Sequence, residues 1–425
     1  MSIVNEVVKT KSGYSLHIVR TDKYKTNTLV WRMKSPLKAE EVTPRGLLPH
    51  VLQSSAKKYP STTALRSYLD ELYGANFFVD LAKKGEYHVM SFSVEVANEK
   101  FLKDAEPLLK KGLQFLADVV LDPNISGDSF HTETVEKEKK NQKVRIQSVF
   151  DDKMRYANSR LVEEMCKDEP YSLHPNGILE EVDKTSAESL YKYYREAIQN
   201  DQIDLYVIGD VDAEEAEKMC EEIFSLQNNR DVQVISSANS ASSHEVNEVI
   251  EKHDVKQGKL NIGYRTNVAY GAEDYWALQV FNGVFGGFSH SKLFINVREK
   301  ASLAYYAASR LESHKGLMMV MSGIDGKNYD QAVTIIKEQM QAMKNGDFTE
   351  GEIQQTKAVI RNQLLETIDT PRGLVEILYH NVVSGQRIEL DHWLESIEKV
   401  TKEEITTVAQ KVNMDTIYFL TGMEG

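Results

Sequence analysis

The organisation of the chain is decided by a polar stretch near its middle, Val234-Ile235-Ser236-Ser237-Ala238-Asn239-Ser240-Ala241-Ser242-Ser243. Because this run of Ser, Ala and Asn has few large apolar side chains, it cannot pack a core, and it predicts a linker over residues 231–245. The linker divides the 425 residues into halves of similar length. We therefore expect a first domain at residues 1–230 and a second at 246–425. A division of this kind calls for a search for an internal repeat.

Three short patterns of the first half return in the same order in the second half. They are a loop that leads into a long charged helix, an acidic segment before a shorter helix, and a strand close to the end of the half. The pairs are 126–130 with 344–349, 180–185 with 395–400, and 205–209 with 418–422. One short match would be chance, but three in the same order predict a duplicated domain.

Each half mixes strands and helices without strict βαβ alternation. Residues 86–96 alternate with a period of two, as a half-buried antiparallel strand should, and residues 316–324 occupy the equivalent place in the second half. Long helices with apolar residues at three- and four-residue spacing are expected to follow, over 98–119 and 328–344. The predicted fold class is α+β, with a mostly antiparallel sheet in each half and helices packed on one face.

Composition and charge limit the function classes. The formal net charge is −13, from 51 basic and 64 acidic residues, and no long basic run occurs. Nucleic acid and an anionic membrane surface are therefore not expected as partners. Cys166 and Cys220 are too few for a disulfide framework, which fits a reducing compartment. We find no signal-peptide pattern and no apolar run long enough for a membrane span, so we expect a cytoplasmic protein.

The common catalytic motifs are missing from the sequence. Residues 281–288 are glycine-rich but lack the Lys-Ser/Thr of a phosphate loop, and no Gly-x-Ser-x-Gly elbow occurs. Neither cysteine has a basic setting that would activate a thiolate. Two zinc-binding imidazoles on one helix face require a spacing of four residues, and no two of the 11 histidines are four apart. The sequence therefore holds no intact helical zinc motif in either direction.

A degenerate version of such a motif lies in the first half. The segments are Leu48-Pro49-His50-Val51-Leu52-Gln53-Ser54 and Leu69-Asp70-Glu71-Leu72-Tyr73-Gly74-Ala75. Together they resemble the inverted zinc motif His-x-x-Glu-His of the M16B (insulinase-like) peptidases and the helix that follows it. In that family both histidines bind zinc, the glutamate is the general base, and a later helix supplies a further glutamate ligand two turns after another family glutamate. The resemblance places His50, Gln53 and Ser54 at the motif positions, and Glu138 and Arg145 at the helix positions.

These departures from the family pattern imply a catalytically silent chain that binds no zinc. A catalytic zinc site needs three protein ligands and an open position for water, and here only His50 remains. The Gln53 amide cannot take a proton from a metal-bound water. The Arg145 guanidinium would place a permanent positive charge beside a cation. His50 is then expected to be a structural histidine.

The second half keeps a family signature. It reads Gly286-Gly287-Phe288-Ser289-His290-Ser291-Lys292-Leu293-Phe294-Ile295-Asn296-Val297-Arg298-Glu299-Lys300-Ala301-Ser302-Leu303-Ala304-Tyr305. In M16B proteins the arginine and the tyrosine of this signature hold the substrate peptide and support the reacting carbonyl. The resemblance therefore implies substrate-binding roles for Arg298 and Tyr305, whose guanidinium and phenol groups can stabilise oxyanion charge. From residue type alone, a surface salt bridge for Arg298 and a core position for Tyr305 stay open.

Loss of the zinc and base residues, with Arg298 and Tyr305 retained, implies a divided active site. In paired M16B proteins one subunit carries the zinc motif and the other supplies the Arg/Tyr pair, and this chain resembles the second kind. The expected partners are a peptide substrate and a sister chain with an intact zinc motif, which would hold the zinc. A homodimer is possible without that partner. The resemblance covers essentially the whole chain and implies a tandem duplication of one α/β roll.

Two alternatives remain. The chain could be a non-enzymatic peptide-binding or scaffolding protein, in which Arg298 and Tyr305 are dispensable. It could also be an active metallopeptidase with unusual ligands, for which His131, Glu133 and Glu136 are the candidates. Acidic residues in the first turn of a helix are, however, expected from the helix dipole alone.

Overall fold

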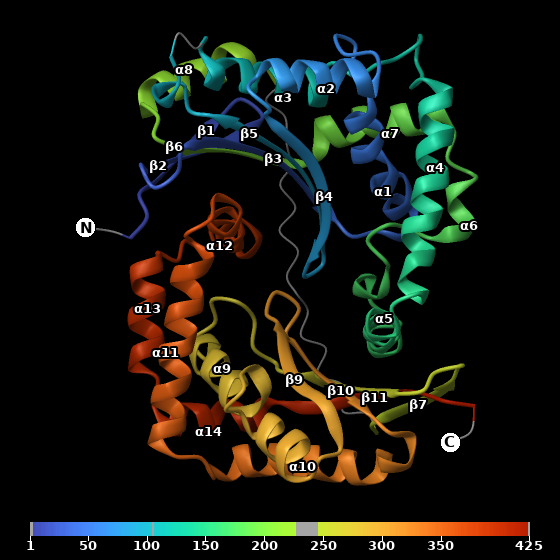
Figure 1. The fold of residues 1–425 in the computed structure, drawn as a ribbon, viewed down its shortest axis with the longest axis vertical. Coiled ribbons are helices and arrows are strands. Elements are labelled where there is room, and N and C mark those ends of the chain that lie inside the picture. The colour runs from blue at the N-terminus through green and yellow to red at the C-terminus, as the bar shows by residue number, and fades with distance from the viewer. Residues whose placement is uncertain (1–2, 104–105, 227–244, 424–425) are drawn as a thin grey trace. The chain divides into compact units, whose positions relative to one another are not determined.

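The structure, a computed structural model, describes residues 3–103, 106–226 and 245–423 (Figure 1). The predicted linker at 231–245 lies almost entirely outside these ranges. The chain forms two compact units. The first comprises residues 1–148 and 173–235, and the second comprises residues 149–172 and 236–425.

The first unit is a mixed sheet with helices. Its strands are β1 (Glu6–Lys11), β2 (Tyr14–Arg20), β3 (Thr26–Pro36), β4 (Asn76–Lys84), β5 (Tyr87–Ala97) and β6 (Gln202–Gly209). Its α-helices are α1 (Ala39–Ser54), α2 (Thr62–Glu71), α3 (Leu108–Leu121), α4 (Thr132–Gln147), α6 (Leu179–Val182), α7 (Ala187–Asn200) and α8 (Ala213–Ile223). The strand order is β1-β2-β6-β3-β5-β4, and only the β2/β6 pair is parallel among these strands.

The second unit repeats this plan. Its strands are β7 (Asn247–Lys252), β8 (Gly258–Arg265), β9 (Ala304–Glu312), β10 (Leu317–Ile324) and β11 (Asn413–Thr421). Its α-helices are α5 (Lys153–Met165), α9 (Tyr275–Asn282), α10 (Tyr329–Asn345), α11 (Glu350–Thr367), α12 (Pro371–Ser384), α13 (Leu390–Lys399) and α14 (Lys402–Lys411), with π-helical segments η4 (Gly283–Gly287) and η5 (Phe294–Lys300).

Strand order confirms the predicted duplication. The second sheet runs β7-β11-β8-β10-β9, which matches β2-β6-β3-β5-β4 of the first sheet position by position. The parallel pair also recurs in place, because β11 pairs with β7 in parallel as β6 does with β2. Strand β1 is an addition at one edge of the first sheet. The mostly antiparallel α+β fold is therefore as predicted.

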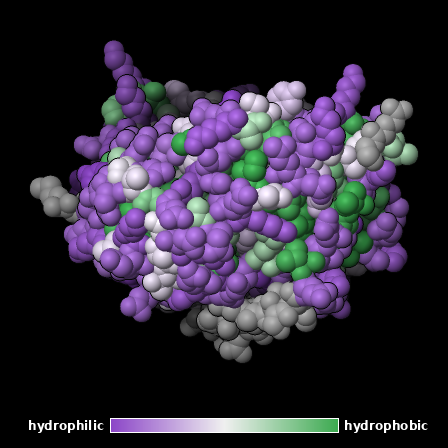
Figure 2. Space-filling view, turned by 90° about the horizontal axis from the view of Figure 1, so that it is seen from below, coloured by the Kyte–Doolittle hydropathy of each residue, from purple (hydrophilic) through white to green (hydrophobic). Residues whose placement is uncertain are grey.

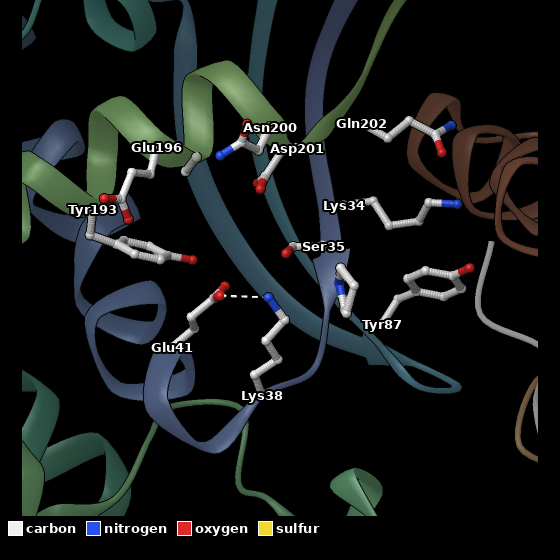
Figure 3. Close-up of a pocket in the computed structure, with 12 residues that line it drawn as sticks. Lys34, Ser35, Lys38, Glu41, Tyr87, Tyr193, Glu196, Asn200, Asp201 and Gln202 are labelled. Carbon is white, nitrogen blue, oxygen red and sulfur yellow. Dashed lines mark hydrogen bonds and ion pairs between the residues drawn. The ribbon is translucent and has the colours of Figure 1, made fainter. Parts of the chain in front are cut away.

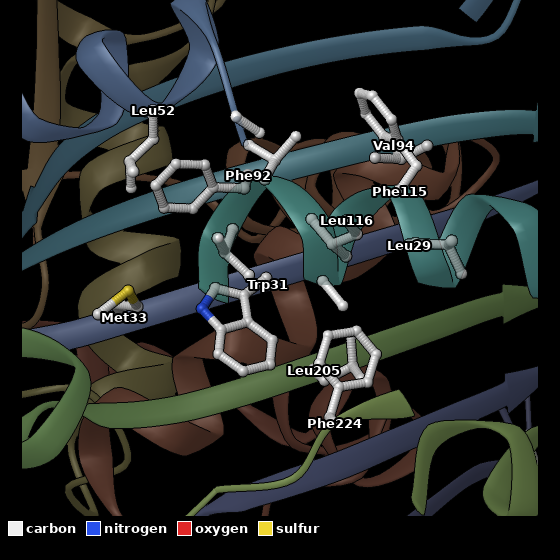
Figure 4. Close-up of a cluster of buried hydrophobic side chains, with 14 of the residues drawn as sticks. Leu29, Trp31, Met33, Leu52, Phe92, Val94, Phe115, Leu116, Leu205 and Phe224 are labelled. Carbon is white, nitrogen blue, oxygen red and sulfur yellow. The ribbon is translucent and has the colours of Figure 1, made fainter. Parts of the chain in front are cut away.

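The core of the first unit lies between its sheet and its helices (Figure 4). Alternate residues of β3, among them Leu29, Trp31 and Met33, point into this core and are at most 1% exposed. Trp31 stacks on Phe224 with ring centroids 5.2 Å apart. Burial of each such side chain contributes about 1.5–3 kcal/mol, so the period-two pattern of the strand fixes which face carries the helices.

In the second unit, both faces of the sheet carry apolar contacts. Met318 and Val320 of β10 join the larger core with α9, α10 and α14, whereas Met319 points the other way and packs with Tyr156 and Leu161 of α5. Helix α5 thus adds a second layer that the prediction of helices on one face did not include. Because α5 packs on the second sheet, residues 149–172 belong to the second unit. The position of the linker had led us to expect them in the first domain.

One predicted helix is shorter than expected. The pattern of residues 98–119 predicted a continuous helix, but α3 begins only at Leu108. Pro107 is its N-cap residue, and a proline lacks the N–H that a preceding helical turn would need. Residues Glu99–Phe101 form a separate 3-10 turn, whose N-cap Asn98 accepts a hydrogen bond from Lys100 N.

Apolar side chains are concentrated in the cores rather than on the surface. The face shown in Figure 2 is largely hydrophilic, with smaller groups of hydrophobic residues between the polar ones. Across the ranges that the structure describes, none of the helices combines the length and the apolar character needed to cross a membrane.

Candidate functional site

The degenerate motif lies on α1, which is held close to α4. Gly46 permits this approach, because a Cβ there would lie 2.6 Å from the carbonyl oxygen of Asn176 and 2.9 Å from Nε2 of Gln142. The Gln142 amide donates to the carbonyl oxygens of Thr43 and Asn176 at 2.9 and 2.7 Å. A buried glutamine on α4 therefore ties the two helices that carry the predicted site residues.

His50 lies half-buried on the last turns of α1. Burial, together with the positive charge of Arg145, lowers the pKa of His50 to about 4, against the opposing effects of Glu138 and Asp80. The imidazole is therefore neutral at physiological pH. Asp80, on the neighbouring strand β4, had not been predicted as part of this site, and its position on a separate strand left no signal in the local sequence.

Glu138 is the centre of a small polar network at the same place. It is 6% exposed. The Ser54 hydroxyl donates to its Oε1 at 3.1 Å, and the Asn141 amide donates to its Oε2 at 3.0 Å. Nη1 of Arg145 lies 4.0 Å from the same Oε2. The structure thus brings together four residues that the family pattern had aligned: His50, Ser54, Glu138 and Arg145.

The partly buried position of the Arg145 guanidinium is energetically unfavourable. Burial lowers the pKa of Arg145, and Glu138 opposes that effect. Its Nε and Nη2 atoms are buried and have no hydrogen-bond partner among the described residues. A guanidinium cannot relieve such burial by losing its proton. Among the residues that the structure describes, Glu138 is the carboxylate close to Arg145, and it serves as the counter-ion of the arginine.

These residues do not fit a catalytic zinc ion. Only one imidazole is present, an amide replaces the base, a hydroxyl replaces the second ligand, and a cation replaces the carboxylate. Residues 3–103, 106–226 and 245–423 contain no group of three or more His, Cys, Asp and Glu side chains that could hold a metal ion. That finding contradicts the unusual-ligand alternative built on His131, Glu133 and Glu136. Glu136 instead accepts a hydrogen bond from Lys139 at 2.9 Å.

In the second unit, Arg298 and Tyr305 are presented to solvent. Arg298 lies in η5, with its guanidinium carbon 4.5 Å from the ring centroid of Phe294. Tyr305 lies on β9, an edge strand of the second sheet, and is 77% exposed. In the described part of the chain, neither side chain has a hydrogen-bond or ion-pair partner. The exposure of Tyr305 contradicts a core position for this residue, and no salt bridge to Arg298 forms within the residues that the structure describes.

The chain that carries Arg298 and Tyr305 is firmly anchored. Asn296 donates to the Lys292 carbonyl oxygen at 3.0 Å and to Gln339 Oε1 on α10 at 2.8 Å. The turn into β9 passes through Ser302, whose φ of 50° is left-handed. Leu303 N donates across this turn to the Val297 carbonyl oxygen at 3.1 Å. π-Helical segments are frequent at functional sites, and Arg298 lies in one.

Comparison with known proteins gives a consistent result. A family model described as "Peptidase M16 inactive domain" matches residues 184–360. The chain is 56% identical over 425 residues to the Bacillus subtilis protein "Probable inactive metalloprotease YmfF", and the match covers 100% of both. It is 28% identical over 160 residues to the Mycobacterium tuberculosis "Uncharacterized zinc protease Rv2782c", covering 37% of this chain and 36% of that one.

Solved structures agree on the fold. A conserved protein from Enterococcus faecalis matches with a TM-score of 0.88 at 34% identity, over 100% of both chains. A "peptidase M16 inactive domain" protein from Pseudomonas fluorescens matches with a TM-score of 0.82 at 15% identity, over 99% of this chain and 98% of that one. At that identity the second likeness concerns the fold alone.

Proposed function

We propose that this chain is the partner subunit of a zinc-bearing sister chain. The premise is that the chain belongs to the M16 peptidase family and is an inactive homologue without catalytic zinc. In this proposal the sister chain holds the zinc and the general base, and this chain supplies Arg298 and Tyr305 to the same substrate peptide. The observation that carries the proposal is the exposure of these two side chains on an anchored segment, where neither has a hydrogen-bond or ion-pair partner among the described residues.

The chemistry of the pair fits this role. A guanidinium and a phenol are hydrogen-bond donors for a peptide carbonyl, and they gain strength as the carbonyl oxygen acquires negative charge. Neither can act as the general base, so the pair would complement a zinc site rather than replace it. Because Tyr305 is exposed on an edge strand, it does not contribute to the core of its own unit. The zinc of the sister chain would supply the activated water.

Loss of the zinc site is consistent with a division of labour. Zinc cannot be held by the side chains at the motif positions, which are Gln53, Ser54 and Arg145. The two helices that carry them still pack closely, through Gln142 and Gly46. The remaining alternative is a peptide-binding or scaffolding protein, in which neither Arg298 nor Tyr305 would matter for cleavage.

The proposal is tested by cleavage of quenched fluorescent peptides in three samples: this chain, a zinc-motif sister chain from the same cell, and the two mixed. We expect activity in the mixture to exceed the sum of the separate samples by at least tenfold, and to be abolished by a chelator. A sister chain that is fully active alone and unchanged by mixing would favour the scaffolding alternative. Chelator-sensitive activity of this chain alone would contradict the assignment of inactivity.

A further inference from the structure

Charged groups around the polar pocket of the first unit are paired with one another (Figure 3). This pocket has a volume of about 270 Å³ and lies where α1 begins and α7 ends. Lys38 Nζ lies 2.8 Å from Glu41 Oε1, and Oδ2 of Asp201 lies 2.7 Å from Nη1 of the buried Arg45. Charges paired in this way do not select a ligand of either sign. Groups that can pair with another chain lie instead at one edge of the second sheet.

Strand β7 forms this edge (Figure 1). It lies at the opposite end of the sheet from β9, the strand that carries Tyr305. The duplication shows what β7 lacks. Strands β7 and β11 correspond to β2 and β6, and in the first sheet β1 pairs with the outer side of β2. No strand within residues 245–423 takes the place of β1 beside β7. An uncovered strand edge presents a row of N–H and C=O groups with which another chain can pair.

The pairing of β7 with β11 determines which backbone groups point outwards. His253 N donates to the Thr421 carbonyl oxygen at 2.9 Å, and the parallel register places Lys252 opposite Thr421. In a parallel pair, alternate residues of a strand direct both backbone groups towards the neighbouring strand. The odd-numbered residues of β7 therefore bond to β11. The N–H and C=O groups of Glu248, Ile250 and Lys252 point away from the sheet.

The side chains of these three residues lie on one face of β7, because a strand has a period of two. Ile250, in the middle, is 53% exposed, and Val246, just before the strand, is 42% exposed. Glu248 and Lys252 are exposed on either side of Ile250. The Tyr329 hydroxyl donates to Oε1 of Glu248, and a carboxylate that accepts this bond can still pair with a cation. The edge thus presents an acidic, an apolar and a basic side chain in a row.

We propose that β7 pairs antiparallel with β7 of a second copy of this chain, with Ile250 opposite Ile250 of that copy. In an antiparallel pair the outward backbone groups of one strand must face those of the other, so Glu248, Ile250 and Lys252 face one another. Centring the pair on Ile250 places each Glu248 opposite Lys252 of the second copy. The apolar contact is then flanked by two ion pairs, and the contact closes by a twofold axis.

Other registers of the same two strands are less favourable. A pair centred on Glu248 or on Lys252 places like charges directly opposite each other, which is destabilising. The two registers in between place Ile250 opposite Glu248 or Lys252, and both ion pairs are lost. Charge therefore selects the register centred on Ile250. This dimer joins the second sheets of two copies and leaves the β9 edge with Tyr305 open, so it does not depend on the function proposed above.

The test is sedimentation of the full chain, without a sister chain, over a hundredfold range of protein concentration. We expect a reversible dimer. Glu248→Lys and Lys252→Glu should each weaken it at least tenfold, because each places like charges opposite each other. The combined variant Glu248→Lys, Lys252→Glu should restore the affinity to within threefold, although it also lacks the bond to Tyr329. Arg310→Glu, on the opposite edge strand β9, is the control that should leave the dimer unchanged.

Amide hydrogen exchange resolved to single residues locates the contact. The amides of Glu248, Ile250 and Lys252 should exchange at least tenfold more slowly in the dimer than in the dilute monomer. Those of Val249 and Glu251 bond to β11 and should not depend on concentration. The proposal is overturned if the chain stays monomeric at every concentration, or if the combined variant does not recover the affinity. It is also overturned if the three outward amides are protected equally at all concentrations, because another segment of the chain would then cover this edge.

Discussion

Nη1 of Arg145 lies 4.0 Å from Oε2 of Glu138, the carboxylate that also accepts a hydrogen bond from Ser54. Both residues are on α4, at the two positions where the family pattern has glutamates. The resemblance aligns Arg145 and Ser54 with metal ligands of the active family members, and in this chain both side chains instead face the buried Glu138 carboxylate. The replacement is a coordinated one, because Arg145 without Glu138 would be a half-buried charge with no close counter-ion.

This relationship predicts that zinc binding can be restored. The combined variant Gln53→Glu, Ser54→His and Arg145→Glu rebuilds the full ligand set around His50. We expect it to retain about one zinc per chain after dialysis, because α1 and α4 still hold the four positions together. Zinc content is measured by mass spectrometry, with Gln53→Glu alone as the control that should bind none. A folded combined variant without zinc would show that the helices no longer have the required spacing.

The neutral state of His50 has its own signature. Its pKa of about 4 lies below the ordinary value of 6.5, so its contribution to stability is complete above pH 6.5 and is lost as the pH falls towards 4. NMR titration of the imidazole should give this low pKa directly. Arg145→Gln should raise it, because a repelling positive charge is removed. Titration of His50 near 6.5 in the unaltered chain would contradict the burial described here.

His17 predicts the opposite dependence. Burial alone would lower its pKa, but hydrogen bonds to Asp204 and Glu6, at 3.2 and 2.8 Å, raise the pKa to about 9. The folded state keeps this proton above pH 6.5, where the unfolded chain releases it. The stabilisation is therefore complete below pH 6.5 and is lost as the pH rises through 9.

At about 1.4 kcal/mol per pKa unit, the His17 contribution is about 3.5 kcal/mol at most. It is measured by urea unfolding at pH 6 and pH 9.5, followed through Trp31 in a Trp276→Phe, Trp393→Phe background. His17→Gln should be less stable at pH 6 and should show less of this alkaline loss. If both proteins lost the same free energy of unfolding between pH 6 and pH 9.5, a protonated His17 would be excluded.

Much of the fold could be predicted, because strands and long helices carry their periodicity locally. Residues 316–324 were predicted as a strand and form β10 at Leu317–Ile324, and residues 328–344 were predicted as a helix and form α10 at Tyr329–Asn345. The repeat could be predicted for the same reason. The register of β7 with β11 could not be, because parallel pairing joins segments far apart in the sequence.

Helix α5 shows where local patterns fail. Its position depends on Glu251, which accepts hydrogen bonds from the Tyr156 and Tyr418 hydroxyls at 2.5 and 2.7 Å and from Arg160 at 3.3 Å. Nothing in the helix pattern indicates a partner so distant in the sequence. Within the site, His50, Gln53, Ser54 and Arg145 could be aligned from a motif, whereas Asp80 and Asn141 could not, because their contacts exist only in the folded chain.

The Glu251 contacts give a fourth prediction. Burial alone would raise its pKa, but the tyrosine and arginine donors lower it to about 2. Glu251→Ala leaves two tyrosine hydroxyls and Arg160 without this acceptor, so we expect amide hydrogen exchange of α5 to accelerate at least tenfold at pH 7. The control is Glu248→Ala, on the same strand, whose hydroxyl partner is Tyr329 on α10. Unchanged exchange in α5 would mean that apolar contacts alone hold this helix.

The central claim is that Arg298 acts on substrate in the active site of a partner chain, and peptide cleavage by a verified complex tests it most directly. The measurement compares kcat/KM of two mixtures, one of the sister chain with the unaltered chain and one of the sister chain with Arg298→Ala. Size-exclusion chromatography first has to show that both mixtures form the complex to the same extent. We predict a loss of at least a hundredfold, equal to about 2.7 kcal/mol of transition-state stabilisation. An Arg298→Ala complex as active as the unaltered one would contradict the account.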